Sequence, residues 1–166
     1  MQTQSSRCSI DRQAHGRVLE FAAFSWPQPG DAMVGWPSVA GAVRRDALNR
    51  AILLHFAPGR VLAPDPSAAT EALLDAAAAQ GVGSGIDVTG KWEHYIIAGP
   101  DAARLLACAI EPGAVLENRE CAAVTLFDCP AVIARTHAGF ELWLQSSYSA
   151  DFLATAERFR AALQRT

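Results

Sequence analysis

Three short apolar runs near the C-terminal end constrain the fold of this chain more than any other feature. They span Ala122 to Phe127, Ala131 to Thr136 and Phe140 to Gln145, and short segments, Asp128-Cys129-Pro130 and His137-Ala138-Gly139, separate them. Connections this short join antiparallel strands, because a parallel pair needs a crossover of about a dozen residues or more. We therefore predict three strands in two successive hairpins.

The segment before these runs predicts a strand followed by a helix. Trp92 to Ala98 is rich in aromatic and β-branched residues, as strands are. Gly99-Pro100-Asp101 then supplies a turn and a helix start, and Pro112-Gly113 is expected to end that helix.

The rest of the chain adds further strands and two more helices. The first 17 residues are polar and are expected to be frayed, whereas Val18 to Phe24, Arg50 to Phe56 and Val61 to Ala63 have the pattern of strands. Ala68 to Gln80 predicts a helix that Asp65 caps and Gly81 ends. A last helix is expected from Ser149, with one apolar face consisting of Phe152, Leu153, Ala156, Phe159 and Leu163.

These elements predict an α+β protein with a mostly antiparallel sheet and helices packed on one side. The 166 residues, of which 51% are hydrophobic, suffice for one sizeable core. We expect residues 1–49 to form an N-terminal arm with one candidate strand at 18–24. Residues 50–166 are expected to form a single α+β domain.

Charge and hydropathy exclude some classes of partner. The formal net charge of -3 gives no positive surface for nucleic acid or for anionic lipid. No apolar run approaches the ~20 residues of a membrane-spanning helix, and the N-terminus lacks the apolar core of a secretory signal. By elimination, a cytoplasmic protein is expected.

The four cysteines are expected to be reduced thiols. Cys8, Cys108, Cys121 and Cys129 form no C-x-x-C pair and have no histidine at ligand spacing, so no metal site is predicted. In the first predicted hairpin, Cys129 lies beside the turn and Cys121 near the open end. The two cysteines are therefore too far apart to form a disulfide.

Two glycine-containing segments superficially resemble phosphate-binding loops. Gly81-Val82-Gly83-Ser84-Gly85 follows a helix, whereas a dinucleotide-binding loop follows a strand, so it is interpreted as a helix stop and connector. At Gly99-Pro100-Asp101 the proline removes an amide donor and the aspartate carboxylate occupies the position of an anion, which favours helix capping. No cofactor-binding residue is assigned.

No catalytic residue is assigned either. His15, His55 and His137 are scattered, and His94, near Glu93, is the least implausible acid or base. Neighbours on a strand face opposite ways, so a partly buried, hydrogen-bonded His94 is the favoured interpretation. The serines around Ser149 lack a nucleophile elbow and are better explained as a helix N-cap.

Two tryptophans lie in a segment that is rich in proline and glycine. Trp26 and Trp36 fall in the stretch from Trp26 to Pro37, which is poorly suited to helix or central strand. Tryptophan is enriched in interface hot spots, so Trp26 and Trp36 are candidate interface residues. The alternative is that both fold back on their own domain.

The order of these elements resembles one known family. The strands from Arg50 to Pro64, the alanine-rich helix, Asp87-Val88-Thr89, the strand to Ala98 with its Gly99-Pro100-Asp101-Ala102 turn, and the closing strand and helix are similar to the gamma subunit of heterotetrameric sarcosine oxidase. The resemblance covers roughly residues 50 to 163.

This resemblance implies a fold like the folate-binding domain of aminomethyltransferases and a non-catalytic structural subunit. Larger flavoprotein subunits would be the partners, and they would hold FAD, FMN, NAD and tetrahydrofolate and oxidatively demethylate sarcosine or a related N-methyl amine. Two alternatives stay open. The partner could be a second copy of the chain, or the chain could be a free-standing folate or small-molecule binding protein.

Overall fold

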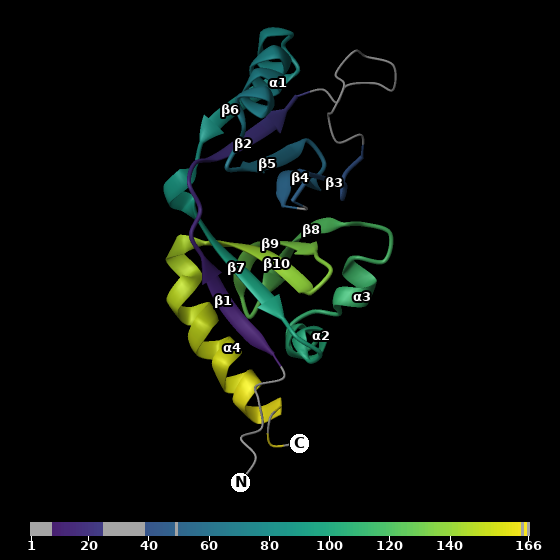
Figure 1. The fold of residues 1–166 in the computed structure, drawn as a ribbon, viewed down its shortest axis with the longest axis vertical. Coiled ribbons are helices and arrows are strands. Elements are labelled where there is room, and N and C mark those ends of the chain that lie inside the picture. Colours follow the sequence, from purple (N-terminus) through teal and green to yellow (C-terminus); the bar gives the residue numbers. More distant parts are fainter. Residues whose placement is uncertain (1–7, 25–38, 49, 164, 166) are drawn as a thin grey trace. The chain divides into compact units, whose positions relative to one another are not determined.

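The computed structural model describes residues 8–24, 39–48, 50–163 and 165. The chain divides into two compact units, and each has an antiparallel sheet (Figure 1). Unit 1 comprises Met1–Ala14, Lys91–Glu117 and Ala123–Thr166, and unit 2 comprises His15–Gly90 and Asn118–Ala122. The α+β class is confirmed, although with two sheets instead of one.

Sheet A, the sheet of unit 1, has the strand order β1-β7-β10-β9-β8. β10 pairs antiparallel with both β9 and β7, and β8 lies beside β9, as the short connections predicted. The strands are β1 (Ser9–Gln13), β7 (Trp92–Ala98), β8 (Cys121–Leu126), β9 (Cys129–Arg135) and β10 (Gly139–Gln145).

Sheet B, the sheet of unit 2, has the order β3-β4-β5-β2-β6. β4 and β5 form the hairpin predicted around Pro58-Gly59. The strands are β2 (Val18–Ala23), β3 (Val43–Arg45), β4 (Ala51–Ala57), β5 (Arg60–Pro64) and β6 (Gly83–Asp87).

Two strands correct the sequence analysis. Ser9–Gln13, expected to be frayed, pairs with β7, and Gly83–Asp87, expected to be a connector, pairs with β2. Neither segment has a strand-like composition, and both are stabilised by the neighbour along which they lie. Residues 1–49, expected to form an arm, thus contribute β1 to sheet A and β2 and β3 to sheet B. The two units are divided at positions other than 49/50.

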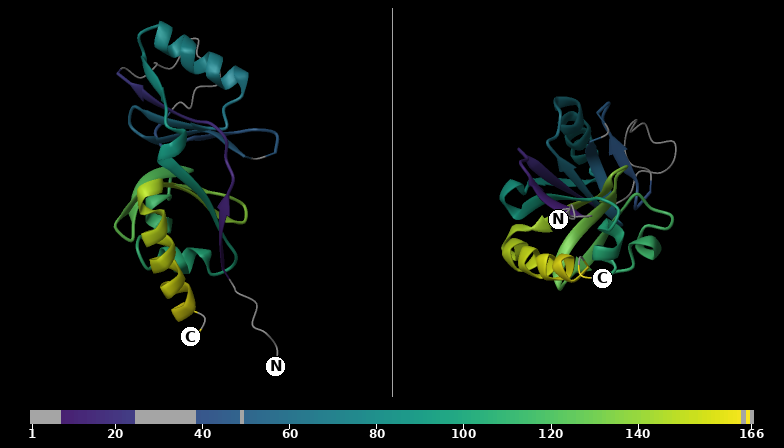
Figure 2. Two further views of the ribbon diagram at one scale, coloured as in Figure 1. Left: turned by 90° about the vertical axis from the view of Figure 1, so that its left-hand side faces the viewer. Right: turned by 60° about the horizontal axis from the view of Figure 1, so that its bottom comes forward.

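Helices cover one face of each sheet. In unit 1, α4 (Ser149–Leu163) lies along sheet A, where the Phe152 ring centroid is 5.6 Å from that of Tyr95 on β7 (Figure 2). In unit 2, α1 (Ala68–Ala79) packs on sheet B. No helix in the described part of the chain has the length and hydrophobicity needed to cross a bilayer.

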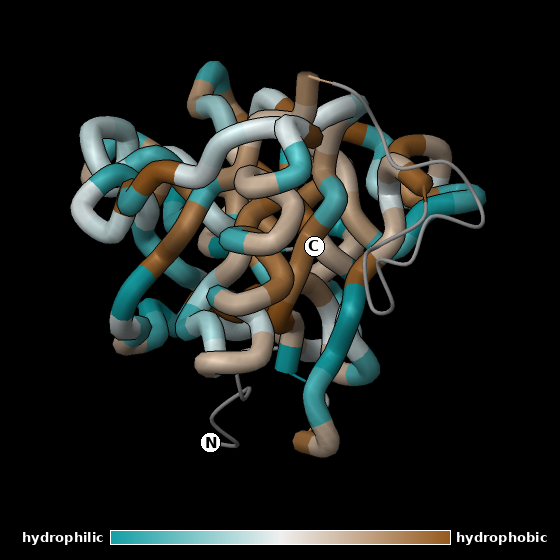
Figure 3. Tube along the Cα trace, turned by 90° about the horizontal axis from the view of Figure 1, so that it is seen from above, coloured by the Kyte–Doolittle hydropathy of each residue, from teal (hydrophilic) through white to brown (hydrophobic). Residues whose placement is uncertain are grey.

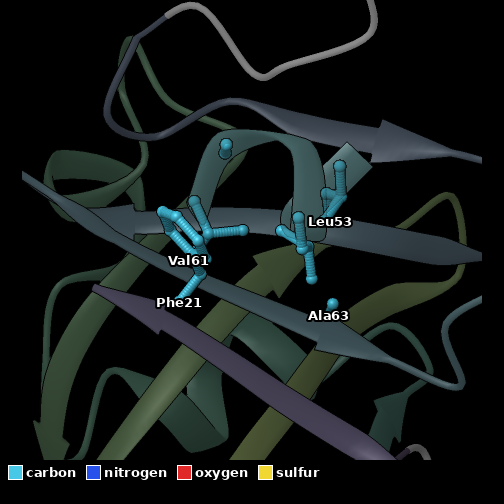
Figure 4. Packing of buried hydrophobic residues seen from close by; sticks show 6 residues of the cluster. Phe21, Leu53, Val61 and Ala63 are labelled. Atoms are coloured by element: carbon cyan, nitrogen blue, oxygen red, sulfur yellow. The ribbon is translucent and has the colours of Figure 1, made fainter. Parts of the chain in front are cut away.

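The core of unit 2 lies between α1 and sheet B (Figure 4). Phe21 from β2 and Leu53 from β4 meet Leu74 and Ala77 from α1, and all four are buried. Figure 3 shows how hydrophobic stretches in brown are interrupted by hydrophilic ones in teal along the trace. Such interruption is expected where only one face of a sheet is covered by a helix.

The start of α1 differs from the prediction. Ser67, not Asp65, is the N-cap, and its side chain accepts a hydrogen bond from the Thr70 backbone N–H at 3.2 Å. The Asp65 carboxylate is engaged elsewhere, because it accepts the Gly16 N–H at 2.5 Å.

The helix after Gly99 is also shorter than predicted. α2 covers Ala102–Leu106, and Pro112 begins a further short helix, α3 (Pro112–Val115), instead of ending the first. A proline suits the first turn of a helix, because its missing N–H would have no partner within the helix at that position.

Candidate functional site

One cluster on sheet A brings an imidazole, a carboxylate and an indole together. His94 on β7 pairs in register with Trp143 on β10, and their rings stack with centroids 4.2 Å apart and planes 3° apart. Glu141 lies two residues before Trp143 and shares its face of the strand. Its Oε1 is 3.2 Å from His94 Nε2 and accepts the Trp143 indole N–H at 3.1 Å.

The geometry of this cluster favours packing over catalysis. Trp143 and Glu141 are buried, at 1% and 6% exposed. The contact from His94 to Glu141 has the distance of an ion pair, although Nε2 does not meet the angle of a hydrogen bond. The indole holds the carboxylate in place and the ring stack holds the imidazole. The arrangement is a tightly packed polar contact within the sheet.

His94 therefore has a different partner from the one considered in the sequence. Glu93 faces the other way and binds Arg12 through two hydrogen bonds of 2.6 Å. Glu141 was missed, because its closeness to His94 depends on the register of β7 and β10. The available signal was a lone acidic residue inside an otherwise apolar strand.

The other histidines and the serines do not join this cluster. His55 is buried in β4 of unit 2, His15 lies at the start of unit 2, and His137 is exposed in the turn before β10. Ser149 is the first residue of α4 and has helical dihedral angles, so its predicted role as the N-cap outside the helix is wrong. Its Oγ lies 2.5 Å from the Tyr95 hydroxyl. This contact joins the start of the helix to β7.

A second buried acid lies in unit 2. Glu20 on β2 is 2% exposed, and its carboxylate forms an ion pair with the Arg60 guanidinium on the neighbouring strand β5. A buried carboxylate needs such a partner to remain charged. The pair is a structural contact between two adjacent strands.

The segment Asp87-Val88-Thr89 is one of those on which the family resemblance is based. Its Asp87 carboxylate is the centre of a group of exposed hydrogen bonds, which we call the clamp. Asp87 accepts hydrogen bonds from the Thr89 hydroxyl at 2.6 Å, the Thr89 N–H at 3.1 Å and Arg17 Nε at 2.8 Å. Arg17 also reaches Glu71 on α1 at 2.6 Å. The motif thus ties the end of β6 to the start of β2 and to α1.

The clamp predicts an acid-sensitive contribution to stability. The hydrogen bonds from Thr89, and then that from Arg17, lower the pKa of Asp87 from 3.8 to about 2. A lowered pKa stabilises the fold above the ordinary value, and this stabilisation is lost as the pH falls from about 4 toward 2. We expect the difference in melting temperature between the wild type and Asp87→Asn to shrink over this range in thermal melts.

Thr89→Val provides the matched variant for this prediction. It removes the hydroxyl donor but leaves the Asp87 carboxylate in place. Its stability should therefore depend less steeply on pH than that of the wild type between about pH 4 and 2. If the melting temperatures of the wild type and Asp87→Asn fall in parallel between about pH 4 and 2, the Asp87 carboxylate does not provide the acid-sensitive stabilisation.

The glycine segments do not form an anion cradle. Gly83–Asp87 is strand β6, and its residues Ser84 and Ile86 lie opposite β2 residues in the ladder. At the second segment, Gly99 has a φ of +106°, and the Asp101 carboxylate lies 3.3 Å from Arg104 without capping α2 through its side chain. Asp101 thus occupies the N-cap position of α2, as predicted, but its carboxylate lies near Arg104 and makes no capping hydrogen bond.

Two of the buried cysteines, Cys8 and Cys129, lack the features of an activated nucleophile. Burial raises the pKa of Cys8 and of Cys129, which keeps their thiols protonated. Cys121 and Cys129 lie at the starts of β8 and β9, at opposite ends of the hairpin, as predicted. Within the described residues, no three His, Cys, Asp or Glu side chains are grouped as metal ligands.

The predicted interface residues Trp26 and Trp36 lie outside the described residues. Their docking on another chain stays a prediction.

Comparison with known proteins gives a likeness in fold. No family model matches the chain, and no curated protein matches it in sequence. Among solved structures, it is similar to a chain of heterotetrameric sarcosine oxidase from Corynebacterium sp. U-96, solved in complex with pyrrole 2-carboxylate. The TM-score is 0.74 at 19% identity, and the match covers 95% of this chain and 86% of the other.

Proposed function

We propose that this chain is a non-catalytic structural subunit of a heteromeric flavoenzyme of the sarcosine oxidase type. The observation that carries the proposal is the fold likeness, which extends over 95% of this chain and 86% of a chain of a heterotetrameric oxidase. The match accounts for almost the whole of both chains. It therefore supports a counterpart of that chain as the role of this one.

The chemistry of the described residues supports a structural role. Glu141, Glu20 and Asp87 are each held by neighbouring side chains within the chain. The glycine segments that could have bound a phosphate form a strand and a helix turn. FAD, FMN, NAD and tetrahydrofolate would accordingly be held by the partner subunits, which would oxidise sarcosine or a related N-methyl amine.

We expect the chain purified alone to contain no flavin and to have no amine-oxidising activity, because its sequence has no recognisable motif for holding a redox cofactor. Visible absorbance of the purified protein and an oxidase assay with sarcosine measure both properties. The matched sample is the same chain co-expressed with the large flavoprotein subunits of its native host. It should elute with them in size-exclusion chromatography as one flavin-containing complex.

The outcomes of this experiment separate the proposal from its alternative. Stoichiometric flavin bound to the chain alone would contradict the structural role. A chain that stays monomeric in the presence of the flavoproteins and binds folate in isothermal titration calorimetry would support a free-standing binding protein of the same fold. A complex whose flavin is present only with the larger subunits supports the proposal.

A further inference from the structure

Strand β6 leaves one side of its backbone without a partner in the described structure. It is the last strand of sheet B and pairs only with β2 (Figure 1). The Val88 N–H donates to Val18 O at one end of the ladder, and the Phe24 N–H donates to Val82 O at the other. Backbone groups alternate along an antiparallel strand, so those of Gly83, Gly85 and Asp87 point away from β2.

This edge lacks the side chains that usually block the addition of another strand. The opposite edge of sheet B, β3, carries Arg44 and Arg45. β6 has the sequence Gly-Ser-Gly-Ile-Asp, and its one charge, Asp87, is bound by Arg17 and Thr89. Charged side chains, prolines and bulges protect edges from strand addition, and β6 has none that remains available for that purpose.

Exposed apolar side chains accompany this edge. Ile86 is 59% exposed, and Phe24, just beyond the end of β2, is 78% exposed. Ile86 lies directly opposite Glu20, and Phe24 is four residues after Glu20, so both side chains are on one face of the sheet. This is the face away from α1, because Phe21 on the other face belongs to the core beneath that helix.

We propose that β6 is a docking edge, on which an extended segment of a partner subunit adds as a further strand of sheet B. The inference rests on the proposed function, which supplies the partner. The hydrogen-bonding groups of Gly83, Gly85 and Asp87 specify an extended backbone as the occupant. Ile86 and Phe24 specify apolar side chains at alternate positions of that segment. Gly85 has no side chain to hinder its approach.

Two variants test the docking edge in the complex with the co-expressed flavoprotein subunits. Gly85→Pro removes an outward N–H that β2 does not use, and Ile86→Lys replaces the apolar contact by a charge. Each variant is expected to raise the dissociation constant of the complex at least about 10-fold, as measured in size-exclusion or surface-binding titrations. Hydrogen exchange should show the amides of Gly83, Gly85 and Asp87 becoming protected when the wild type assembles.

Matched controls separate docking from folding. Gly85→Ala keeps the N–H, and its new Cβ would lie 3.6 Å from the Phe21 ring, an ordinary contact. Leu48→Lys places the same charge at another exposed apolar residue of unit 2, which is 74% exposed. Both controls should assemble like the wild type, and Ile86→Lys alone should melt at the wild-type temperature.

The remaining outcomes overturn the inference. If the wild type joins the flavoproteins, and Ile86→Lys and Gly85→Pro join them equally well with no protection of the β6 amides, the docking edge is wrong while the proposed function stands. If β6 becomes protected only in a homodimer, the occupant is a second copy and the inference is wrong. If the wild type does not join the flavoproteins at all, the proposed function fails and the inference fails with it.

Discussion

Replacing Phe21 with alanine is expected to lower the free energy of unfolding by about 3–5 kcal/mol, the usual cost of truncating a buried aromatic side chain. Phe21 is 1% exposed and packs with Leu53, Val61 and Leu74 beneath α1. Its ring also lies against the backbone of β6, where a Cβ added at Gly83 would come within 2.6 Å of it. The truncation should therefore loosen the helix and the edge strand together.

Chemical denaturation followed by circular dichroism measures this loss. Phe24→Ala is the matched control, because it truncates the same side chain three residues further along, where it is 78% exposed. Phe24→Ala should change the free energy of unfolding by less than about 0.5 kcal/mol relative to the wild type. Equal losses for the two variants would show that the core beneath α1 has been assigned wrongly.

Replacing Trp143 with alanine is expected to cost a similar amount, about 3–5 kcal/mol, in unit 1. The indole is 1% exposed and stacks on His94, and its N–H donates to the buried Glu141 carboxylate. Alanine would leave a cavity and would remove that donor from Glu141. Urea denaturation of the isolated chain measures the sum of both effects.

Trp143→Phe separates the packing of the ring from the hydrogen bond. Phenylalanine keeps much of the ring against His94 but cannot donate to Glu141, so a loss of about 1–3 kcal/mol is expected. A loss as large as that of Trp143→Ala would mean that the hydrogen bond dominates. No loss would mean that Glu141 does not depend on the indole.

The strands that carry strong local signals were predictable from the sequence. Trp92 to Ala98 and the C-terminal hairpins have aromatic or β-branched content and connections too short for any other topology. Ser9–Gln13 and Gly83–Asp87 have neither, and they are strands because β7 and β2 offer them hydrogen-bonding partners. Local composition cannot reveal a strand whose stability comes from its neighbour.

The polar contacts were less predictable than the strands. The proximity of His94 to Glu141 depends on the register of β7 against β10, and that of Glu20 to Arg60 on the register of β2 against β5. Sequence spacing showed only that Glu93 and His94 face opposite ways. Residues far apart in sequence become neighbours through pairings that each strand does not specify alone.

The path of the chain has a consequence for the order in which the protein can fold. Ser9 of β1 pairs with Ala98 of β7, so the first strand of sheet A is synthesised long before its partner. Unit 2 lies almost entirely between them, and its strands and α1 can assemble first. The pairing of β1 with β7 must then close the long loop that contains most of unit 2, and such a late, long-range contact slows folding. On the ribosome, sheet A can be completed only after β10 has emerged, and α4 can pack on the completed sheet only after that.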